Sequence, residues 1–357
     1  MEEKEFVQWL KENALLDTAI KFSLFFEDVY KKNLNLNGEK ILIIGDLGSE
    51  GRRIPALMLA CYFFAAKSMK KNVEIIIQDP KFRGDVASEK LIEKLFFMPE
   101  ESIIVLCMSG KIGSLKSIGR SFRKYAQMKK HKFISLSGLN FMKTELFPSI
   151  VHSLRYDPNM MKERGERVKE QLDKAIEVRI TTDEGTDVVV KKKGVKCVLN
   201  SGLYNEFGTG GNLPAGEVYF HPEGTVNVNG KVVVDGSIRT HEGTIVLRTK
   251  VELIIEEGKI VKISGGKEAK MLEDSIEWAE KKAKTKENVR KIAEIGIGLN
   301  PNARILGPTI IDEKTLGTAH IANGSNHWFG GPIKSSIHYD HVFKCPKIYA
   351  DGKLLKV

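Results

Sequence analysis

The sequence predicts an α/β N-terminal domain with a doubly wound parallel sheet, followed by an α+β C-terminal domain with mainly antiparallel strands. The chain has 357 residues, more than one hydrophobic core usually serves, so two domains are expected. The first 140 residues alternate short apolar runs with helical stretches, which is typical of a parallel sheet covered on both faces. From about residue 157, short strands separated by glycine and asparagine turns indicate antiparallel hairpins. We therefore place the domains at residues 1–155 and 156–357.

In the first domain, we expect an opening helix and then strands and helices in alternation. The expected strands are, in order, KILIIGDLG, VEIIIQD, SIIVLCMSG and KFISLSGL. The expected helices between them are RIPALMLACYFFAAKSMKK, a segment near residues 88–97 and one that reaches about residue 130. Because these strands are apolar throughout, both faces of the sheet should be buried.

The glycine-rich loop GDLGSEGRR, residues 45–53, lies between the first expected strand and a helix. Such a turn can present backbone N–H groups to a phosphate. The loop fits neither GxGxxG nor the Walker pattern, and no acidic ribose partner is evident. We therefore favour a plain βα turn, with a ligand-binding loop as the alternative.

The second domain is expected to begin with a charged bridging helix, PNMMKERGERVKEQLDKAI. The strands EVRITTDEG, TDVVVKKKG and KVVVDGSI follow it, and one helix at about residues 271–295 interrupts the hairpins. Six of the eight histidines lie after residue 215. We therefore expect the chemistry of the protein to lie in this domain.

The net charge of +10 is compatible with binding to nucleic acid, but its distribution argues against it. Lysines are spread along the chain and often stand beside glutamates, as in EWAEKKAKTKENVRK, which is typical of a solvated helix face. No apolar run approaches the length of a membrane span. The four cysteines show no CxxC pairing, which favours reduced thiols and a cytoplasmic protein.

Histidines and carboxylates in the second domain have a spacing that suits metal ligation. His338 and Asp340 are two residues apart, so on an extended segment both side chains point to the same face. His320 follows an expected turn, and Glu217 and Glu294 each stand beside glycines that allow ligands to crowd a small site. Together these residues indicate a centre for two divalent ions. A hydrogen-bonded His–Asp pair at a strand end is the structural alternative.

Five motifs in order resemble the aminopeptidase T and aminopeptidase S family of thermophilic, leucyl aminopeptidase-like metalloaminopeptidases. They are NLPAGEVYFHPEGTVNVNGKVVVDGSI, EIGIGLNP, IIDEKTLGTAHIANG, IHYD and KIYADGKLLKV. The resemblance implies a cytoplasmic, often dimeric hydrolase with two divalent ions, zinc, cobalt or manganese, in its C-terminal domain. Carried over motif by motif, the implied metal ligands are Glu217, Glu294, Glu313, His320, His338 and Asp340.

Two departures from the aminopeptidases point to an alternative chemistry. The spacing between Glu313 and His320 is longer than in that family, so Glu313 is the least secure ligand. Seven residues after His320, where the aminopeptidases have a tyrosine, this chain has His327. The longer form is similar to the branch that contains 2,5-dihydroxypyridine dioxygenase, which uses a single iron held by histidines and an aspartate. Two histidines and an aspartate with open positions form the facial arrangement of such iron enzymes.

We predict a dinuclear metallohydrolase that removes N-terminal residues from peptides. In this hypothesis Glu294 carries the proton to the leaving group, and His327 donates an N–H to the reacting group. His221 either lines the substrate pocket or lies on the surface. His341 faces away from the site. The first alternative is a mononuclear Fe(II) ring-cleaving dioxygenase. The second is a nonenzymatic nucleotide-binding or regulatory protein, which would depend on the loop at residues 45–53 and leaves the clustered ligands unexplained.

Overall fold

A computed structural model of the chain describes residues 1–82, 84–119 and 121–357, apart from the side chain of Ser117. The described residues form two compact units. The first comprises Met1–Pro158 and Gly202–Pro214, and the second comprises Asn159–Ser201 and Ala215–Val357. No helix within the described part of the chain is long and apolar enough to cross a membrane.

The first unit contains a five-stranded parallel sheet with the order β2-β1-β3-β4-β8. Its strands are β1 (Ile41–Gly45), β2 (Val73–Ile77), β3 (Ile103–Cys107), β4 (Lys132–Leu136) and β8 (Gly210–Asn212). The first four are the strands that the apolar runs predict. The fifth was not predicted, because it comes from a short glycine-rich segment that returns to this sheet from the second half of the sequence.

Helices cover both faces of the parallel sheet, as the prediction of a doubly wound fold requires. The helices of this unit are α1 (Glu3–Glu12), α2 (Leu16–Asp28), α3 (Ile54–Ser68), α4 (Glu89–Phe96), α5 (Phe122–Met128) and α6 (Phe147–Ser153), with short turns η1 (Val29–Asn33), η2 (Lys116–Ile118), η3 (Leu139–Phe141) and η4 (Thr144–Leu146). Leu42 and Ile44 of β1 pack in one core cluster with side chains of α4 and α5. Ile41 and Ile43 alternate with them and face the other side, where α3 contacts β1 and β3.

The loop after β1 is stabilised by contacts within its own unit. Asp46 accepts hydrogen bonds from the Ser109 amide (2.8 Å) and hydroxyl (2.6 Å) beyond β3, and from the Gly48 amide (2.9 Å). The Arg53 amide donates to the Thr144 hydroxyl at 2.8 Å. These amides are therefore engaged by protein oxygens, which favours the plain βα turn over a phosphate-binding loop.

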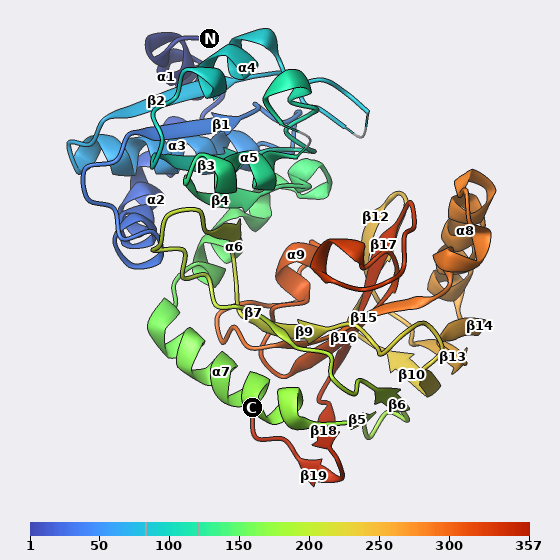
Figure 1. Cartoon of the computed structure of the whole chain (residues 1–357). Helices are drawn as coiled ribbons and strands as arrows, with labels where there is room; N and C mark the ends of the chain where they lie inside the picture. Colours follow the sequence, from blue (N-terminus) through green and yellow to red (C-terminus); the bar gives the residue numbers. More distant parts are fainter. Residues whose placement is uncertain (83, 120) are drawn as a thin grey trace. The chain divides into compact units, whose positions relative to one another are not determined.

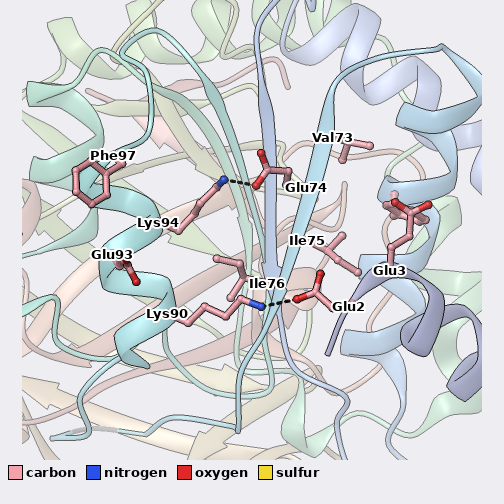
Figure 2. A pocket seen from close by; sticks show the side chains of 11 residues that line it. Glu2, Glu3, Val73, Glu74, Ile75, Ile76, Lys90, Glu93, Lys94 and Phe97 are labelled. Carbon is pink, nitrogen blue, oxygen red and sulfur yellow. Dashed lines mark hydrogen bonds and ion pairs between the residues drawn. The ribbon is translucent and has the colours of Figure 1, made fainter.

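A hollow of about 460 Å³ lies beside the edge strand β2 of the first unit (Figure 2). Its lining includes charged side chains of α4 and of the chain's N-terminus. Lys90 pairs with Glu2 at 2.8 Å, and Lys94 pairs with Glu74. These opposite charges neutralise one another on an accessible surface, so the hollow lacks the buried excess charge of a metal site.

The second unit is built from two antiparallel seven-stranded sheets, in the orders β14-β13-β10-β6-β5-β18-β19 and β12-β11-β17-β16-β15-β9-β7. We call the latter the β16 sheet. Its strands are β7 (Val198–Asn200), β9 (Glu217–Phe220), β11 (Ser237–Thr240), β12 (Gly243–Val246), β15 (Ile292–Gly298), β16 (Thr318–Gly324) and β17 (His338–Lys344). The other sheet contains β5 (Glu177–Thr181), β6 (Asp187–Lys191), β10 (Val228–Val234), β13 (Val251–Glu256), β14 (Lys259–Gly265), β18 (Lys347–Ala350) and β19 (Lys353–Leu354).

The helices of the second unit are α7 (Pro158–Lys174), α8 (Lys267–Lys282) and α9 (Thr309–Asp312), with short turns η5 (Lys286–Val289) and η6 (His327–Phe329). Figure 1 shows α8 beside β13 and β14, and α8 also contacts β11. The prediction of one helix over residues 271–295 is wrong in its second half, because α8 ends at Lys282 and β15 begins at Ile292. β-Branched isoleucines alternating with glycines in IAEIGIG disfavour a helix and fit a buried strand.

Candidate metal centre

Four neighbouring strands of the β16 sheet carry five of the six predicted ligands. β9 carries Glu217, β15 carries Glu294, β16 carries His320, and β17 carries His338 and Asp340. The order β17-β16-β15-β9 makes these strands adjacent. The spacing of two between His338 and Asp340 places both on the same face of β17. The antiparallel register therefore gathers residues that are more than 120 positions apart in sequence.

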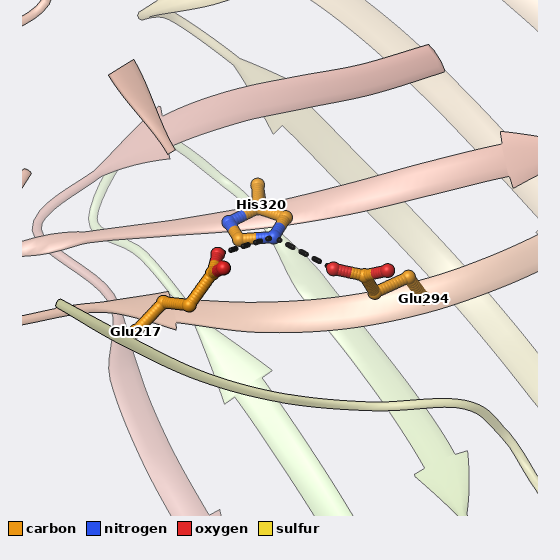
Figure 3. A group of neighbouring side chains, drawn as sticks. All are labelled: Glu217, Glu294 and His320. Atoms are coloured by element: carbon orange, nitrogen blue, oxygen red, sulfur yellow. Dashed lines mark hydrogen bonds and ion pairs between the residues drawn. The ribbon is translucent and has the colours of Figure 1, made fainter. Parts of the chain in front are cut away.

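His320 lies between two glutamates at the centre of this group (Figure 3). Its Nε2 is 3.3 Å from Glu294 Oε1 and 3.9 Å from Glu217 Oε2. The His320 side chain is fully buried, and its Nδ1 has no hydrogen-bond partner among the described residues. A buried imidazole with an orphaned nitrogen is costly in a closed core, so this ring is better suited to ligation than to a structural role.

His338 contacts the second part of the group. Its Nε2 is 3.1 Å from Asp340 Oδ1 and 3.5 Å from Glu294 Oε2. Its Nδ1 lies 2.8 Å from the Ser325 carbonyl oxygen, which can only accept, so Nδ1 carries the proton and donates it there. This backbone contact orients the ring and directs Nε2 toward the carboxylates, as is common for metal-bound histidines.

Glu313 lies before β16 and also reaches the cluster, although its sequence spacing made it the least secure ligand. Three sets of ligand atoms lie mutually within 4.8 Å: Glu217, Glu294 and His320; Glu294, His338 and Asp340; Glu313, His320 and Asp340. Glu294, His320 and Asp340 each belong to two sets. Among the described residues, no set contains both imidazoles. The six donors therefore form an extended cluster with shared members.

Lys314 is a member of the cluster that the sequence analysis missed. Its side chain is 1 % exposed, and its Nζ is 2.6 Å from Glu217 Oε1 and also pairs with Glu313. A lysine is seldom fully buried unless it is paired. Its position directly after Glu313 was visible in the sequence, but a lysine beside a glutamate is usually a solvated pair, so only the fold shows that it is buried.

When both imidazoles are neutral, as metal ligation requires, the cluster has more negative than positive charge. Burial alone would lower the pKa of His320, but its hydrogen bond to Glu294 and the charges of Glu313 and Asp340 outweigh burial and raise the pKa to about 9. Asp340 and Glu294 likewise raise the pKa of His338 to about 10. Burial raises the pKa of Glu313 to about 8 despite the neighbouring Lys314. The imidazoles are thus protonated at neutral pH in the metal-free protein, where they stand in for bound cations.

These residues fit a divalent metal centre. Carboxylate oxygens and imidazole nitrogens are ligands that zinc, cobalt and manganese accept. Burial of three carboxylates and partial burial of a fourth, Glu313, beside a single ammonium group is unfavourable unless positive charge is added. The cluster therefore has suitable ligand atoms, an imidazole oriented toward the carboxylates, and negative charge that a divalent cation would neutralise.

Two glycines of β15 make room for the cluster. Gly296 pairs with His320 in the register, and a Cβ at Gly296 would lie 2.1 Å from the His320 Cε1 and Nε2 atoms. At Gly298, which pairs with Glu217, a Cβ would lie 2.1 Å from the Thr315 carbonyl oxygen. The alternation of glycine with isoleucine in this strand therefore lets the His320 ring lie flat against the sheet.

The remaining histidines of the region lie outside the three sets. His327 is exposed in η6, where its Nδ1 lies 3.0 Å from the Ser325 hydroxyl and its ring meets the edge of Trp328. His341 is fully buried, and its Nε2 lies 2.8 Å from Asn323 Oδ1. It follows Asp340 on β17 and so projects from the other face. The His221 Nδ1 donates to the Pro222 carbonyl at 2.8 Å, and its ring faces Phe329.

Comparison with known proteins agrees with this architecture. A model of the family NicX, 2,5-dihydroxypyridine 5,6-dioxygenase, matches residues 148–356. The chain belongs to this family. The match covers the whole β16 sheet, including every predicted ligand. A search of curated protein sequences gives no match.

Two solved structures share the fold over nearly the whole chain. The 2,5-dihydroxypyridine dioxygenase of Pseudomonas putida KT2440 has a TM-score of 0.70 at 18 % identity, covering 94 % of this chain and 95 % of that chain. Wild-type AmpT from Thermus thermophilus has a TM-score of 0.62 at 16 % identity, covering 93 % and 96 %. The resemblance to the aminopeptidase T group and to its dioxygenase-like branch is thus confirmed, as is the predicted fold class.

Gly296→Ala should displace His320 and weaken metal binding by about 10- to 100-fold, a loss typical of disturbed ligand orientation, while the protein remains folded. Isothermal titration with Zn²⁺ would measure the affinity, and circular dichroism the fold. Gly38→Ala is the matched control, because a Cβ at Gly38 meets nothing within 4 Å. Unchanged affinity in Gly296→Ala would show that the clearance above Gly296 does not position a ligand.

Metal binding should release protons, because both imidazoles are protonated in the metal-free protein and must be neutral to ligate. Their raised pKa values, about 9 and about 10, predict that metal affinity increases with pH between 6 and 9. Calorimetric titration in two buffers of different ionisation enthalpy measures the proton count. His338→Ala should release about one proton fewer than the wild type at pH 7.5. A proton count that is the same in both proteins would contradict the assigned charge states.

Proposed function

We propose that this protein is a metal-dependent aminopeptidase whose centre holds two divalent ions. The observation that carries the proposal is the convergence of four carboxylates and two imidazoles in which no described ligand set contains both imidazoles. A mononuclear iron centre of the facial type needs two histidines and one carboxylate on one ion. Two overlapping sets joined by a shared carboxylate are what a dinuclear centre needs.

Glu294 is the proposed shared ligand. Its Oε1 faces His320 and its Oε2 faces His338, at 3.3 and 3.5 Å from the respective Nε2 atoms. One ion would take Glu217, Glu294 and His320, and the other would take Glu294, His338 and Asp340. Glu313, beside His320 and Asp340, is the proposed sixth ligand. Lys314 would hold Glu217 and Glu313 in place through its two ion pairs.

When bound, the two ions would lower the pKa of a water molecule from about 16 toward about 7 and polarise the scissile carbonyl. The side chains of the protein supply the rest of the reaction. Glu294 lies between both imidazoles and is the proposed carrier of the proton to the leaving amine, a role that requires one of its two oxygens to be free of metal during the reaction. His327 would donate an N–H to the developing negative charge. A carboxylate of the cluster would receive the free α-amine of the peptide, which limits cleavage to the N-terminal residue.

We further propose zinc, cobalt or manganese as the ions, since all three accept mixed oxygen and nitrogen ligands. The resemblance to the aminopeptidases supports a cytoplasmic homodimer. Separate cores for residues 1–155 and 156–357 are proposed on the different strand patterns of the two halves, with Gly202–Pro214 as the exception because it belongs to the first unit. The loop at residues 45–53 has no proposed ligand.

A mononuclear Fe(II) ring-cleaving dioxygenase is the second candidate, and the family match over residues 148–356 favours it. In that case His320, His338 and Asp340 would hold the iron, and Glu217 and Glu294 would not ligate. Both candidates use the same face of the β16 sheet. They differ in the number of ions and in whether the reaction consumes dioxygen.

Metal stoichiometry and two activity assays distinguish the candidates. We expect two divalent ions per chain by elemental analysis after titration, and hydrolysis of aminoacyl-p-nitroanilides without consumption of dioxygen. His338→Ala and Asp340→Ala should each abolish hydrolysis while the first unit stays folded. His152→Ala, an exposed histidine of α6, is the control and should keep full activity. A plateau at one iron per chain together with dioxygen uptake on 2,5-dihydroxypyridine would replace the aminopeptidase by the dioxygenase.

His327→Ala should retain metal and lower turnover by about 10²- to 10³-fold, which is the usual cost of removing one donor to a developing oxyanion. His327→Tyr should recover part of the loss, because a tyrosine stands at this position in the aminopeptidases. Metal content, melting temperature and turnover must be measured on the same preparation. A His327→Ala protein that loses metal, or that keeps its specific activity, removes this residue from the mechanism.

A further inference from the structure

The metal cluster is most accessible at His338. The His338 side chain is 20 % exposed, whereas those of Glu217, Glu294 and Asp340 are 8 % exposed and that of His320 is fully buried. A substrate that reaches the cluster from solvent therefore arrives beside His338. The residues next to this imidazole are the first ones that the substrate can contact.

Trp328 stands next to His338. The two rings meet edge to face, with centroids 4.8 Å apart and an interplanar angle of 74°. Trp328 is nevertheless 55 % exposed, so most of this large apolar side chain remains free of protein contacts. Because this exposed aromatic ring contacts a proposed metal ligand, a substrate bound at the metal would pack against it.

The aromatic surface continues from Trp328 along the site. Phe329 lies 5.3 Å from Trp328 and 5.3 Å from Tyr219 between ring centroids. Tyr219 follows Glu217 by two residues on β9, so both side chains project from the same face of the strand. We call Trp328, Phe329 and Tyr219 the aromatic wall. It begins at the most accessible ligand and runs toward the strand that carries Glu217.

The loop that presents Trp328 is anchored at a fully buried asparagine. The Asn326 Nδ2 donates to the Ala293 carbonyl at 3.0 Å, one residue before Glu294, and its Oδ1 accepts from the Ile333 amide at 2.8 Å. Gly331 is required beside it, because a Cβ there would lie 2.2 Å from Asn326 Cγ. The exposed tryptophan therefore sits on a fixed turn tied to the strand of a ligand, which is the kind of preorganisation that a binding surface needs.

We propose that Trp328 is a specificity-determining residue that selects substrates with an aromatic or large apolar group next to the reacting bond. This proposal rests on the aminopeptidase function, in which that group is the side chain of the N-terminal residue. Edge-to-face or offset contacts between aromatic rings add to the gain from apolar burial. Peptides with N-terminal phenylalanine or leucine are then preferred over those with alanine.

The test compares Trp328→Ala and Trp328→Phe with the wild-type, metal-loaded protein on phenylalanine, leucine and alanine p-nitroanilides. Trp328→Ala should lower kcat/KM for phenylalanine by about 10- to 100-fold, the range that apolar pocket contacts reach, and leave the alanine substrate nearly unchanged. Trp328→Phe should keep most of the preference. Trp278→Ala is the control, because Trp278 is an exposed tryptophan of α8 that stacks on His241.

A binding measurement separates this proposal from the proposed function. Calorimetry with free L-phenylalanine and L-alanine gives the ratio of their dissociation constants without any turnover. We expect phenylalanine to bind more tightly to the wild type and the ratio to approach one in Trp328→Ala, at unchanged metal content. If the wild type hydrolyses no peptide but this shift in ratio is seen, the aminopeptidase function fails and the role of Trp328 stands. An equal ratio in wild type and Trp328→Ala, or no preference in the wild type, overturns the role of Trp328.

Discussion

The burial of several carboxylates on one face of a β-sheet is the constraint on which the second unit depends. Glu217, Glu294 and Asp340 are all buried, and ligand atoms of Glu217 and of Asp340 each lie within 4.8 Å of a Glu294 oxygen. Like charges in such a position repel strongly, and desolvation adds to the cost. Lys314 supplies one permanent positive charge, and the two imidazoles supply proton-dependent ones. The fold must therefore be stable enough elsewhere to tolerate a site that is favourable only when cations occupy it.

The rest of the β16 sheet serves this constraint. Neighbouring strands place the donors in register, and Gly296 of β15 leaves open the space that a larger side chain would take from the His320 ring. The Ser325 carbonyl fixes the tautomer of His338. Ser325 and Asn326 belong to the same anchored turn that presents Trp328, so ligand orientation and the aromatic wall depend on one short segment after β16.

The same architecture is found in a dioxygenase and in AmpT, and electrostatics explains how one sheet can support both. Two histidines and an aspartate suffice for a single iron, whereas additional glutamates can complete a second position. The number of carboxylates near the histidines then decides whether the centre holds one ion or two. In this chain Glu217, Glu294 and Glu313 all remain in the cluster, which is why we favour two ions here.

The sequence by itself determined the two fold classes and most of the strands of the first unit, because apolar periodicity is a local property. The HxD spacing and the glycines beside the carboxylates indicated five of the six residues that the structure brings together, whereas Glu313 was implied only by the resemblance to the aminopeptidases. The sequence failed where the outcome depends on distant partners. We predicted that the helix at about residue 271 continues to residue 295, into the segment IAEIGIG. Pairing of this segment with β9 and β16 makes it a strand instead. Nothing in the local sequence marks Lys314 as buried, and nothing local predicts β8. Burial and strand pairing are set by the whole chain, so only the tertiary structure decided which charges would be forced together and which rings would stand beside them.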